Sequence, residues 1–291
     1  MTKPLQVEVA TAVSVQQHLP KRPLDGHKGT FGCVLIAGGS AHYWGAPYFS
    51  ALAAFRAGAG LVALAVPQTI RPTLATQLPE AIFPPISAQN LLDKTSAETL
   101  LTSIEQQQAL LIGPGLDQAE AFFNSLLTQS EQLPPLVIDA DGLNLLADQE
   151  NWPTKLPPNT ILTPHPGEMA RLINLSLPEL LKLDRLKLAQ EKAQAWGHIV
   201  LLKGANTVVA APTGEATILP FANPMLAVGG SGDVLAGVIA SLLAQGVTPY
   251  EAAVLGGYIH GATGLEVDGR FGLLASEIAN LVTVTMQRLV S

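Results

Sequence analysis

Short runs of consecutive apolar residues recur along the chain, and most of them are followed by small or polar residues and then by a longer helical pattern. Six such runs occupy residues 33–39, 61–67, 109–115, 136–142, 160–167 and 199–204. Continuous apolar character, as opposed to alternation, is typical of strands that are covered on both faces. The pattern therefore predicts an α/β fold with a doubly wound, mostly parallel sheet that is flanked by helices on both faces.

A hairpin is predicted directly after the last of these runs. Residues 207–211 and 216–220 are rich in apolar and β-branched side chains, and a Pro-Thr-Gly-Glu turn at 212–215 separates them. We expect this hairpin at one edge of the sheet. Residues 1–25 are expected to form an N-terminal helix or arm, but their pattern assigns them no position in the fold.

Helix signals dominate the C-terminal third of the chain. Ser176 and Glu179 form a capping box that predicts the start of a helix, and Gly197 is a natural left-handed residue for its end. A second capping box, at residues 248–251, predicts another helix start. Between them, residues 233–245 are apolar nearly all round, so we expect a buried helix there.

Composition places the chain among proteins with a large core. Of its 291 residues, 48% are hydrophobic and 13% are charged, whereas an average soluble protein has roughly 25% charged residues. Disordered chains combine low hydrophobicity with high net charge, so that class is excluded. No linker, internal repeat or charge block marks a boundary, and we therefore expect a single domain over residues 1–291.

Charge and cysteine content narrow the partners and the compartment. The 16 basic and 23 acidic residues give a net charge of −7, and no Lys/Arg cluster could follow a phosphate backbone, so nucleic acid is not an expected partner. The single Cys33 can form no internal disulfide. The first twenty residues show no signal peptide, and the most apolar stretch, 234–244, is about half of the ~20 residues that cross a bilayer. We expect a cytoplasmic protein with no membrane partner.

A glycine-rich loop precedes the predicted buried helix, within residues 223–237. Its glycines let the backbone approach a ligand closely, and the helix start presents free amides and a positive dipole end. We therefore predict an anion hole at Gly230, Ser231 and Gly232. Asp233, in the first helical turn, has two interpretations: a helix N-cap, for which Asp is favoured, or a base that acts on a substrate hydroxyl.

The same segment resembles the terminal glycine-rich helix of ribokinase-like proteins, in which the Asp is the catalytic base for phosphoryl transfer. Further motifs narrow the resemblance to the ADP/ATP-dependent NAD(P)H-hydrate dehydratases. Over roughly residues 28–265, six motifs occur in order: GGSAHYWGAPYFSALAAFRAGAGLV (38–62), GPG (113–115), DADGLN (139–144), TPHPGE (163–168), LLKGANT (201–207) and GGSGDVLAG (229–237). Two departures are Met225, where the family often has Gly, and Ser231, where Thr is commoner.

The resemblance implies repair of nicotinamide cofactors that have added water across the reduced ring. The S epimer of hydrated NADH or NADPH would be phosphorylated at its C6 hydroxyl, because phosphate leaves more easily than hydroxide. Elimination of phosphate would then restore NADH or NADPH, and ADP as donor would yield AMP and phosphate. Asp233 would be the catalytic base, with ADP or ATP as phosphoryl donor. Mg²⁺ is the implied cofactor, bound mostly through phosphates and water.

The resemblance also assigns binding roles. Contacts with the hydrate are expected from Asp233 and from Ala46, Gly115 and His165. The nucleotide is expected to contact Lys203, Gly204, Ala205, Asn206, Thr207 and Gly232. The nucleotide phosphates should therefore lie between the strand end at residues 203–207 and the loop at 229–232. The alternatives are a solvated Lys203 at an ordinary strand corner and a purely structural His165.

Four further polar residues stand near strand ends. Glu168 and Asn144 are expected to order the water molecules around Mg²⁺, and helix capping is the alternative for Glu168. Asp139 and Asp141 stand at the end of a predicted strand, as in dinucleotide-binding folds. No GxGxxG turn precedes them, so the sequence does not support a ribose-binding role for them.

Two other functions remain compatible with the sequence. A small-alcohol kinase of the same superfamily, acting on a thiazole alcohol or a pyridoxal-like compound, would use the same loop and Asp233 but release the phosphoester. A nucleotide-binding sensor without turnover would gain little from a carboxylate beside phosphates. The resemblance further implies a homotetramer. Because only about 27 residues precede the first motif, we expect no epimerase domain in this chain.

Overall fold

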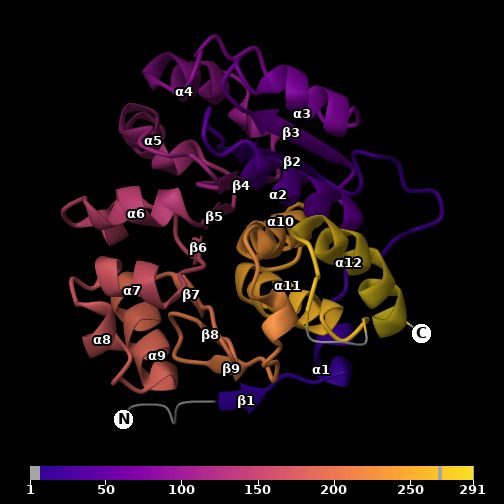
Figure 1. The fold of residues 1–291 in the computed structure, drawn as a ribbon, viewed down its shortest axis with the longest axis vertical. Helices are drawn as coiled ribbons and strands as arrows, with labels where there is room; N and C mark the ends of the chain where they lie inside the picture. The colour runs from indigo at the N-terminus through magenta and orange to yellow at the C-terminus, as the bar shows by residue number, and fades with distance from the viewer. Residues whose placement is uncertain (1–6, 268–270, 291) are drawn as a thin grey trace.

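The structure, a computed structural model, describes residues 7–267 and 271–290. Its strands form one nine-stranded sheet in the order β1-β9-β8-β7-β6-β5-β4-β2-β3 (Figure 1). The strand bounds are β1 (Val7–Val9), β2 (Cys33–Ala37), β3 (Leu61–Ala65), β4 (Ala109–Ile112), β5 (Leu136–Ile138), β6 (Ile161–Leu162), β7 (Ile199–Leu202), β8 (Val208–Ala210) and β9 (Ala216–Ile218).

Strand pairing confirms the predicted mostly parallel sheet. Each of the six apolar runs contains one strand, and these strands, β2 to β7, pair with one another in parallel. The predicted hairpin is also confirmed, since β8 is antiparallel to both β7 and β9. Its predicted place at the edge is wrong. The chain's N-terminal strand β1 pairs in parallel with β9 and lies outside it.

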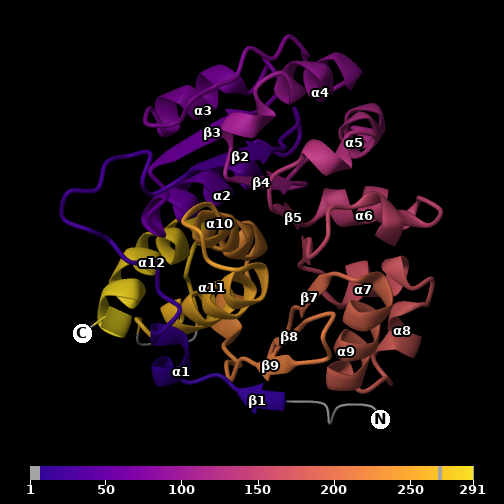
Figure 2. The same ribbon diagram turned by 180° about the vertical axis from the view of Figure 1, so that it is seen from behind.

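Helices cover both faces of this sheet. On one side lie α2, α10, α11 and α12, and on the other lie α4 to α7 and α9 (Figures 1 and 2). The helix bounds are α1 (Ala12–Gln16), α2 (Gly45–Arg56), α3 (Arg71–Gln77), α4 (Lys94–Leu101), α5 (Glu120–Leu127), α6 (Asp141–Ala147), α7 (Pro166–Leu172), α8 (Leu177–Leu180), α9 (Arg185–Trp196), α10 (Ser231–Ala244), α11 (Pro249–Thr263) and α12 (Ala275–Val290).

The continuous apolar runs are explained by burial on both faces. In β2, Val34 and Ile36 belong to the hydrophobic cluster under α2 and α10, whereas Leu35 and Ala37 belong to the cluster under α4, α5 and α6. Burying one such aliphatic side chain stabilises the fold by roughly 1.5–3 kcal/mol. No helix within the described ranges combines the length and apolarity needed to cross a membrane.

One predicted helix is broken in two. The capping box of Ser176 and Glu179 does open a helix, α8, but this helix ends after one turn. Asp184 then caps a new helix, α9, because its carboxylate accepts a hydrogen bond from the Lys187 amide at 2.9 Å. The predicted end is confirmed, since Gly197 adopts a left-handed conformation with φ of 75°.

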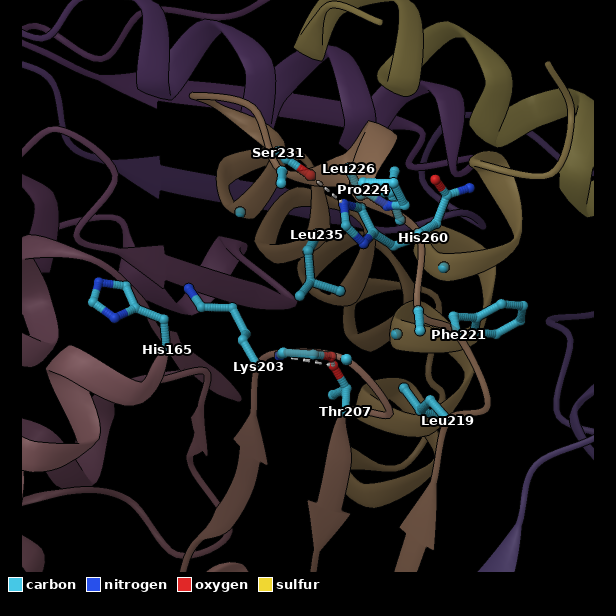
Figure 3. A pocket seen from close by; sticks show the side chains of 18 of the residues that line it. His165, Lys203, Thr207, Leu219, Phe221, Pro224, Leu226, Ser231, Leu235 and His260 are labelled. Atoms are coloured by element: carbon cyan, nitrogen blue, oxygen red, sulfur yellow. Dashed lines mark hydrogen bonds between the residues drawn. The ribbon is translucent and has the colours of Figure 1, made fainter. Parts of the chain in front are cut away.

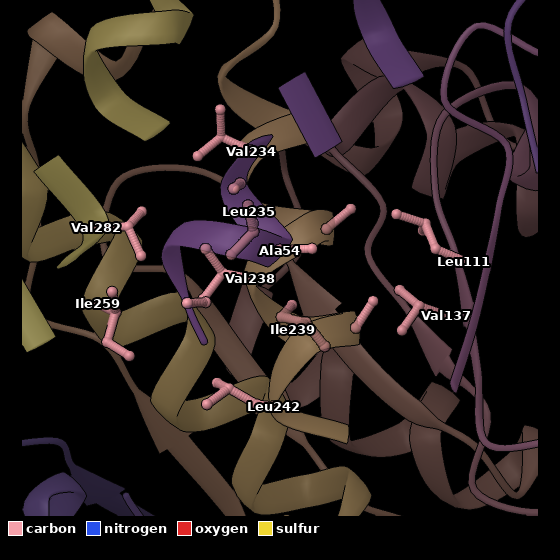
Figure 4. Close-up of a cluster of buried hydrophobic side chains, with 14 of the residues drawn as sticks. Ala54, Leu111, Val137, Val234, Leu235, Val238, Ile239, Leu242, Ile259 and Val282 are labelled. Carbon is pink, nitrogen blue, oxygen red and sulfur yellow. The ribbon is translucent and has the colours of Figure 1, made fainter. Parts of the chain in front are cut away.

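The predicted buried helix is confirmed as α10, which begins at Ser231, and its buried side chains fill the centre of the larger cluster (Figure 4). It packs directly on the backbone of α2. A Cβ atom built on Gly237 would lie 2.1 Å from the Ser50 carbonyl oxygen. The Ser50 hydroxyl also donates a hydrogen bond to the Asp233 carbonyl oxygen at 3.0 Å. The two helices therefore touch over the turn that carries Asp233.

We predict that Gly237→Ala destabilises the protein by about 1–3 kcal/mol, because the added methyl group must push α10 away from α2. Urea unfolding measures this difference. Gly229→Ala is the matched control, since a Cβ atom there would meet no heavy atom within 4 Å. Equal stability of the Gly237→Ala variant and the wild-type protein would contradict the close packing of the two helices.

Candidate active site

The predicted site residues gather at the carboxyl ends of the parallel strands, where ligands bind in open α/β sheets. Strand order reverses between β2 and β4. The loops after these two strands touch, since the Gly39 amide donates to the Pro114 carbonyl oxygen at 2.8 Å. A Cβ atom built on Gly115 would lie 3.1 Å from the Ala46 Cβ. The structure therefore places the two small residues predicted to contact the hydrate next to each other at the switch point.

Lys203 lies in a buried group of charges that we call the lysine–carboxylate cluster: Lys203, Asp139 and Glu168. The Lys203 Nζ atom is 2.7 Å from Asp139 Oδ1 and 3.7 Å from Glu168 Oε2. Burial by itself lowers the pKa of Lys203, but the two carboxylates outweigh burial and hold this pKa above its ordinary value. Lys203 is therefore cationic at neutral pH, and the interpretation of Lys203 as an ordinary solvated lysine is wrong.

His165 caps α7 and pairs with Glu168. Its Nδ1 atom accepts hydrogen bonds from the amides of Gly167 and Glu168, at 2.9 and 3.3 Å. Glu168 Oε2 accepts in return from the His165 amide at 2.7 Å, so the capping role of Glu168 is confirmed. Burial and then the Lys203 charge lower the His165 pKa. The ring is thus neutral at pH 7, with its proton on Nε2, which lies 3.3 Å from Glu168 Oε1.

The residues predicted to order Mg²⁺ waters have their oxygens engaged by protein groups. Both carboxylate oxygens of Glu168 face His165, and the Asn144 amide oxygen accepts from Arg171 at 2.7 Å. In the part of the chain that the structure describes, no three His, Cys, Asp or Glu side chains group as a metal site. These residues do not fit as direct Mg²⁺ ligands, and their role through water stays a prediction.

The predicted anion hole depends on a backbone that requires glycine, but one of its three amides is engaged, because the Ser231 amide donates to the Val228 carbonyl oxygen at 3.2 Å. Gly230 is the N-cap of α10 with φ of 89°, and a Cβ atom there would lie 2.7 Å from Phe49 Cδ2. Because Gly230 is the N-cap, the N-cap interpretation of Asp233 is wrong. Among the described residues, no group donates a hydrogen bond to the Asp233 carboxylate. Burial, followed by the charge of Asp139, raises the Asp233 pKa to about 7, so this carboxylate can accept a proton near neutral pH.

A cavity of about 540 Å³ opens beside the anion hole. Lys203 and His165 point to the same side of it, while Leu219, Phe221, Pro224 and Leu226 form an apolar wall (Figure 3). Of the residues predicted to contact the nucleotide, Lys203, Gly204, Ala205, Thr207 and Gly232 line this cavity.

Four predicted contacts do not line the cavity. The backbone amide of Asn206 donates to the Phe221 carbonyl oxygen at 2.8 Å, so this residue ties the loop to the apolar wall. Asp233 is the chain neighbour of Gly232, which does line the cavity. Ala46 and Gly115 lie at the switch point described above. His165, which is predicted to contact the hydrate, lines the same cavity as most of the residues predicted to contact the nucleotide.

Sequence reasoning missed two pairings. His260, on α11, lines the cavity, and its Nε2 atom is 2.9 Å from the Ser231 hydroxyl oxygen. Burial lowers the His260 pKa to about 4, so the ring is neutral. The sequence placed Asp139 at a strand end but predicted no partner for it. Its partner Lys203 stands 64 residues away, and a carboxylate at the end of a buried strand was the only available signal.

Comparison with known proteins identifies a family. A family model described as NAD(P)H-hydrate dehydratase matches residues 34–285. The ADP-dependent (S)-NAD(P)H-hydrate dehydratase of Neisseria meningitidis serogroup B is 38% identical over 279 residues, which cover 92% of this chain and 90% of that protein. The bifunctional NAD(P)H-hydrate repair enzyme of Moorella thermoacetica is 40% identical over 288 residues, which cover 96% of this chain and 54% of that protein. The chain spans about half the length of such bifunctional relatives.

Solved structures agree as well. The ADP/ATP-dependent NAD(P)H-hydrate dehydratase from Bacillus subtilis, co-crystallised with ATP and Mg²⁺, superposes with a TM-score of 0.82 at 30% identity. The superposition covers 97% of this chain and 99% of that chain. A ribokinase-like superfamily protein is also among the matching structures, which confirms the predicted ribokinase-like fold.

We predict that Asp233→Asn is more stable than the wild-type protein above pH 7. The folded pKa of about 7 exceeds the ordinary 3.8. Unfolding therefore releases a proton between pH 4 and 7, and the stability that this group contributes falls as the pH rises through that window. The variant should gain on the order of 1–3 kcal/mol at pH 8 and nothing near pH 4. Urea unfolding at several pH values measures the difference.

Asp148 supplies the matched control, because Asp148→Asn makes the same chemical change at a position exposed to solvent. If Asp233→Asn had no effect on stability at any pH, the Asp233 carboxylate would be no more costly in the folded protein than in the unfolded chain.

Proposed function

This chain belongs to the NAD(P)H-hydrate dehydratase family, and we propose that it dehydrates the S epimer of hydrated NADH and NADPH at the expense of a nucleotide. The observation that carries the proposal is the Asp233 carboxylate. It has a pKa of about 7 and stands in the first turn of α10. The anion hole is directly before it, and a cavity of about 540 Å³ adjoins that hole.

The geometry supports phosphorylation of the C6 hydroxyl. Asp233 takes the hydroxyl proton while the oxygen attacks the terminal phosphorus of the nucleotide. The amides of Gly230 and Gly232, at the positive end of α10, hold the charge that develops on the phosphoryl group, whereas the Ser231 amide donates to the Val228 carbonyl oxygen. Lys203 lines the cavity and adds a fixed positive charge. A base that is half ionised near pH 7 suits proton transfer at physiological pH.

Elimination completes the reaction. The lone pair of the ring nitrogen expels phosphate from C6, and loss of a proton from the neighbouring ring carbon forms the double bond. The products are NADH or NADPH, phosphate and, with ADP as donor, AMP. The neutral His165 ring lines the cavity and is the proposed contact for the hydrate. Ala46 and Gly115 leave room for the dinucleotide because neither carries a bulky side chain.

ADP is the proposed phosphoryl donor. The relative from N. meningitidis is named as ADP-dependent, and the relative from B. subtilis as ADP/ATP-dependent. Mg²⁺ would neutralise the nucleotide phosphates and would be held by phosphate oxygens and water. By the family resemblance we also propose a homotetramer, and the single Cys33 supports a cytoplasmic location.

We predict that Asp233→Asn retains ADP binding and loses 10²- to 10⁴-fold in turnover, roughly the contribution of a general base. The substitution removes the base but leaves the backbone amides in place. Turnover is followed as the rise of reduced-nicotinamide absorbance from hydrated NADH and ADP, and ADP binding is measured by calorimetry. Near wild-type turnover of the variant would remove Asp233 from the mechanism.

The same assay separates the dehydratase from a small-alcohol kinase. A kinase would accumulate the organic phosphoester, whereas the dehydratase releases free phosphate and reduced cofactor in equal amounts. Thiazole-alcohol and pyridoxal-like substrates serve as the comparison. Phosphoester formation from these compounds, without activity on the hydrates, would favour the kinase.

We predict similar kcat/KM values for the NADH and NADPH hydrates. The sequence has no GxGxxG turn with a following acidic residue to reject a 2′-phosphate, and no Arg cluster to demand one. Intact NADH and NADPH should inhibit only weakly, because they lack the hydroxyl on which Asp233 acts. A preference above about 10²-fold for one hydrate, equal to roughly 2.7 kcal/mol, would reveal a specific 2′-site.

A further inference from the structure

We propose that Asp139 is a positioning residue that holds the Lys203 ammonium against the anion hole, where it meets the terminal phosphate of the nucleotide. The proposal rests on the proposed function, since it concerns nucleotide binding at the same site. Asp139 itself contacts Lys203 and would not contact the nucleotide.

The Asp139 carboxylate is held from two neighbouring strands. It follows β5, and its side chain is 2% exposed. Its Oδ1 atom accepts from Lys203 Nζ, after β7, at 2.7 Å and from the Thr163 hydroxyl, after β6, at 2.7 Å. Because the Asp139 carboxylate is buried and its Oδ1 atom lies 2.7 Å from Lys203 Nζ, the charge-assisted hydrogen bond of this ion pair holds the ammonium in place.

The ion pair lies directly against the anion hole. A Cβ atom built on Gly232 would be 3.4 Å from Lys203 Nζ and 3.9 Å from Asp139 Oδ2. Lys203 also lines the cavity, and in Figure 3 its side chain reaches from the end of β7 towards the side where His165 lies. Lys203 therefore directs its charge to the place where the amides of α10 would hold a phosphate.

Without Asp139 the ammonium would have a competing partner. Glu168 Oε2 is 3.7 Å from Lys203 Nζ, so an unpaired Lys203 would turn towards Glu168 and leave the anion hole. The backbone would stay in place, because Arg185 donates to the carbonyl oxygens of Lys203 at 3.1 Å and Ala205 at 2.6 Å. Loss of Asp139 would thus release the lysine side chain and not the loop.

Asp139 also leaves a signature in the pH profile. The charged groups that influence Asp233 are Asp139, Lys203, Asp141 and Glu168. After burial, the charge of Asp139 is the main cause of the raised Asp233 pKa. Replacing Asp139 by a neutral residue lowers that pKa. The acidic limb of the kcat/KM profile, which reports ionisation of the base, then moves to lower pH.

The test compares Asp139→Asn with Thr163→Val in the full chain. We expect Asp139→Asn to weaken Mg·ADP binding, measured by calorimetry, by about 10- to 10²-fold, the size of effect that small misplacement produces. We also expect the acidic limb of its kcat/KM profile to lie at lower pH than that of the wild-type protein. Thr163→Val removes a hydrogen bond from the same Asp139 oxygen but keeps the ion pair. It should bind Mg·ADP like the wild-type protein and keep the acidic limb in place.

A double substitution that leaves the net charge unchanged keeps the proposal testable if Asp139→Asn alone misfolds. Asp139→Asn combined with Lys203→Met removes both charges of the ion pair, while Glu168 keeps its hydrogen bond from the His165 amide. If Asp139 acts through Lys203, adding Asp139→Asn to Lys203→Met causes no further loss of Mg·ADP binding. Further loss in that background would overturn the proposal. Wild-type Mg·ADP affinity of Asp139→Asn would also overturn it. Equal losses of Mg·ADP affinity in Asp139→Asn and Thr163→Val would overturn it as well.

Calorimetry also separates this proposal from the proposed function. If the wild-type protein binds Mg·ADP but does not convert the hydrates, the proposed function is wrong. The Mg·ADP affinities of Asp139→Asn and Thr163→Val still test the role of Asp139 in that case. If the wild-type protein does not bind Mg·ADP at all, both are wrong.

Discussion

Burial of α10 is the constraint on which the rest of this structure depends. The helix is packed from end to end, with Gly237 in contact with the Ser50 backbone of α2. Its first turn is also the proposed anion hole and carries Asp233. Because protein interiors are close-packed and yield little, the amides and the base are held by the same contacts that form the core.

The second constraint is electrostatic. Carboxylates from several strand and helix ends share a small volume with one lysine, and burial raises the pKa of both Asp233 and Glu168 to about 7. Such an arrangement lowers stability at neutral pH. It also leaves a carboxylate that can accept a proton near neutral pH next to a cation. Under the proposed function, the loss of folding free energy accompanies a catalytic role, as is common where neighbouring charges shift pKa values.

Much of the fold follows from local pattern. Each of the six apolar runs became a strand, and the buried helix and the hairpin appeared where their residues indicated. Errors occurred where a distant segment or a competing cap decided the outcome. The strand β1 joins β9 across most of the chain length. Asp184 restarts a helix that periodicity alone would continue, because its side chain satisfies an amide of the next turn.

Within the site, sequence by itself determined which residue types stand at strand and helix ends: a glycine-rich helix start, an Asp in its first turn and a lysine after a buried strand. Only the tertiary structure decided their partners. The pairing of Asp139 with Lys203 joins the ends of β5 and β7, and that of Ser231 with His260 joins α10 and α11. Local pattern records whether a position is buried, but not which distant side chain shares its environment. Strand order and helix packing set the distances between such groups, and those distances, with burial, set the charge and direction of each side chain.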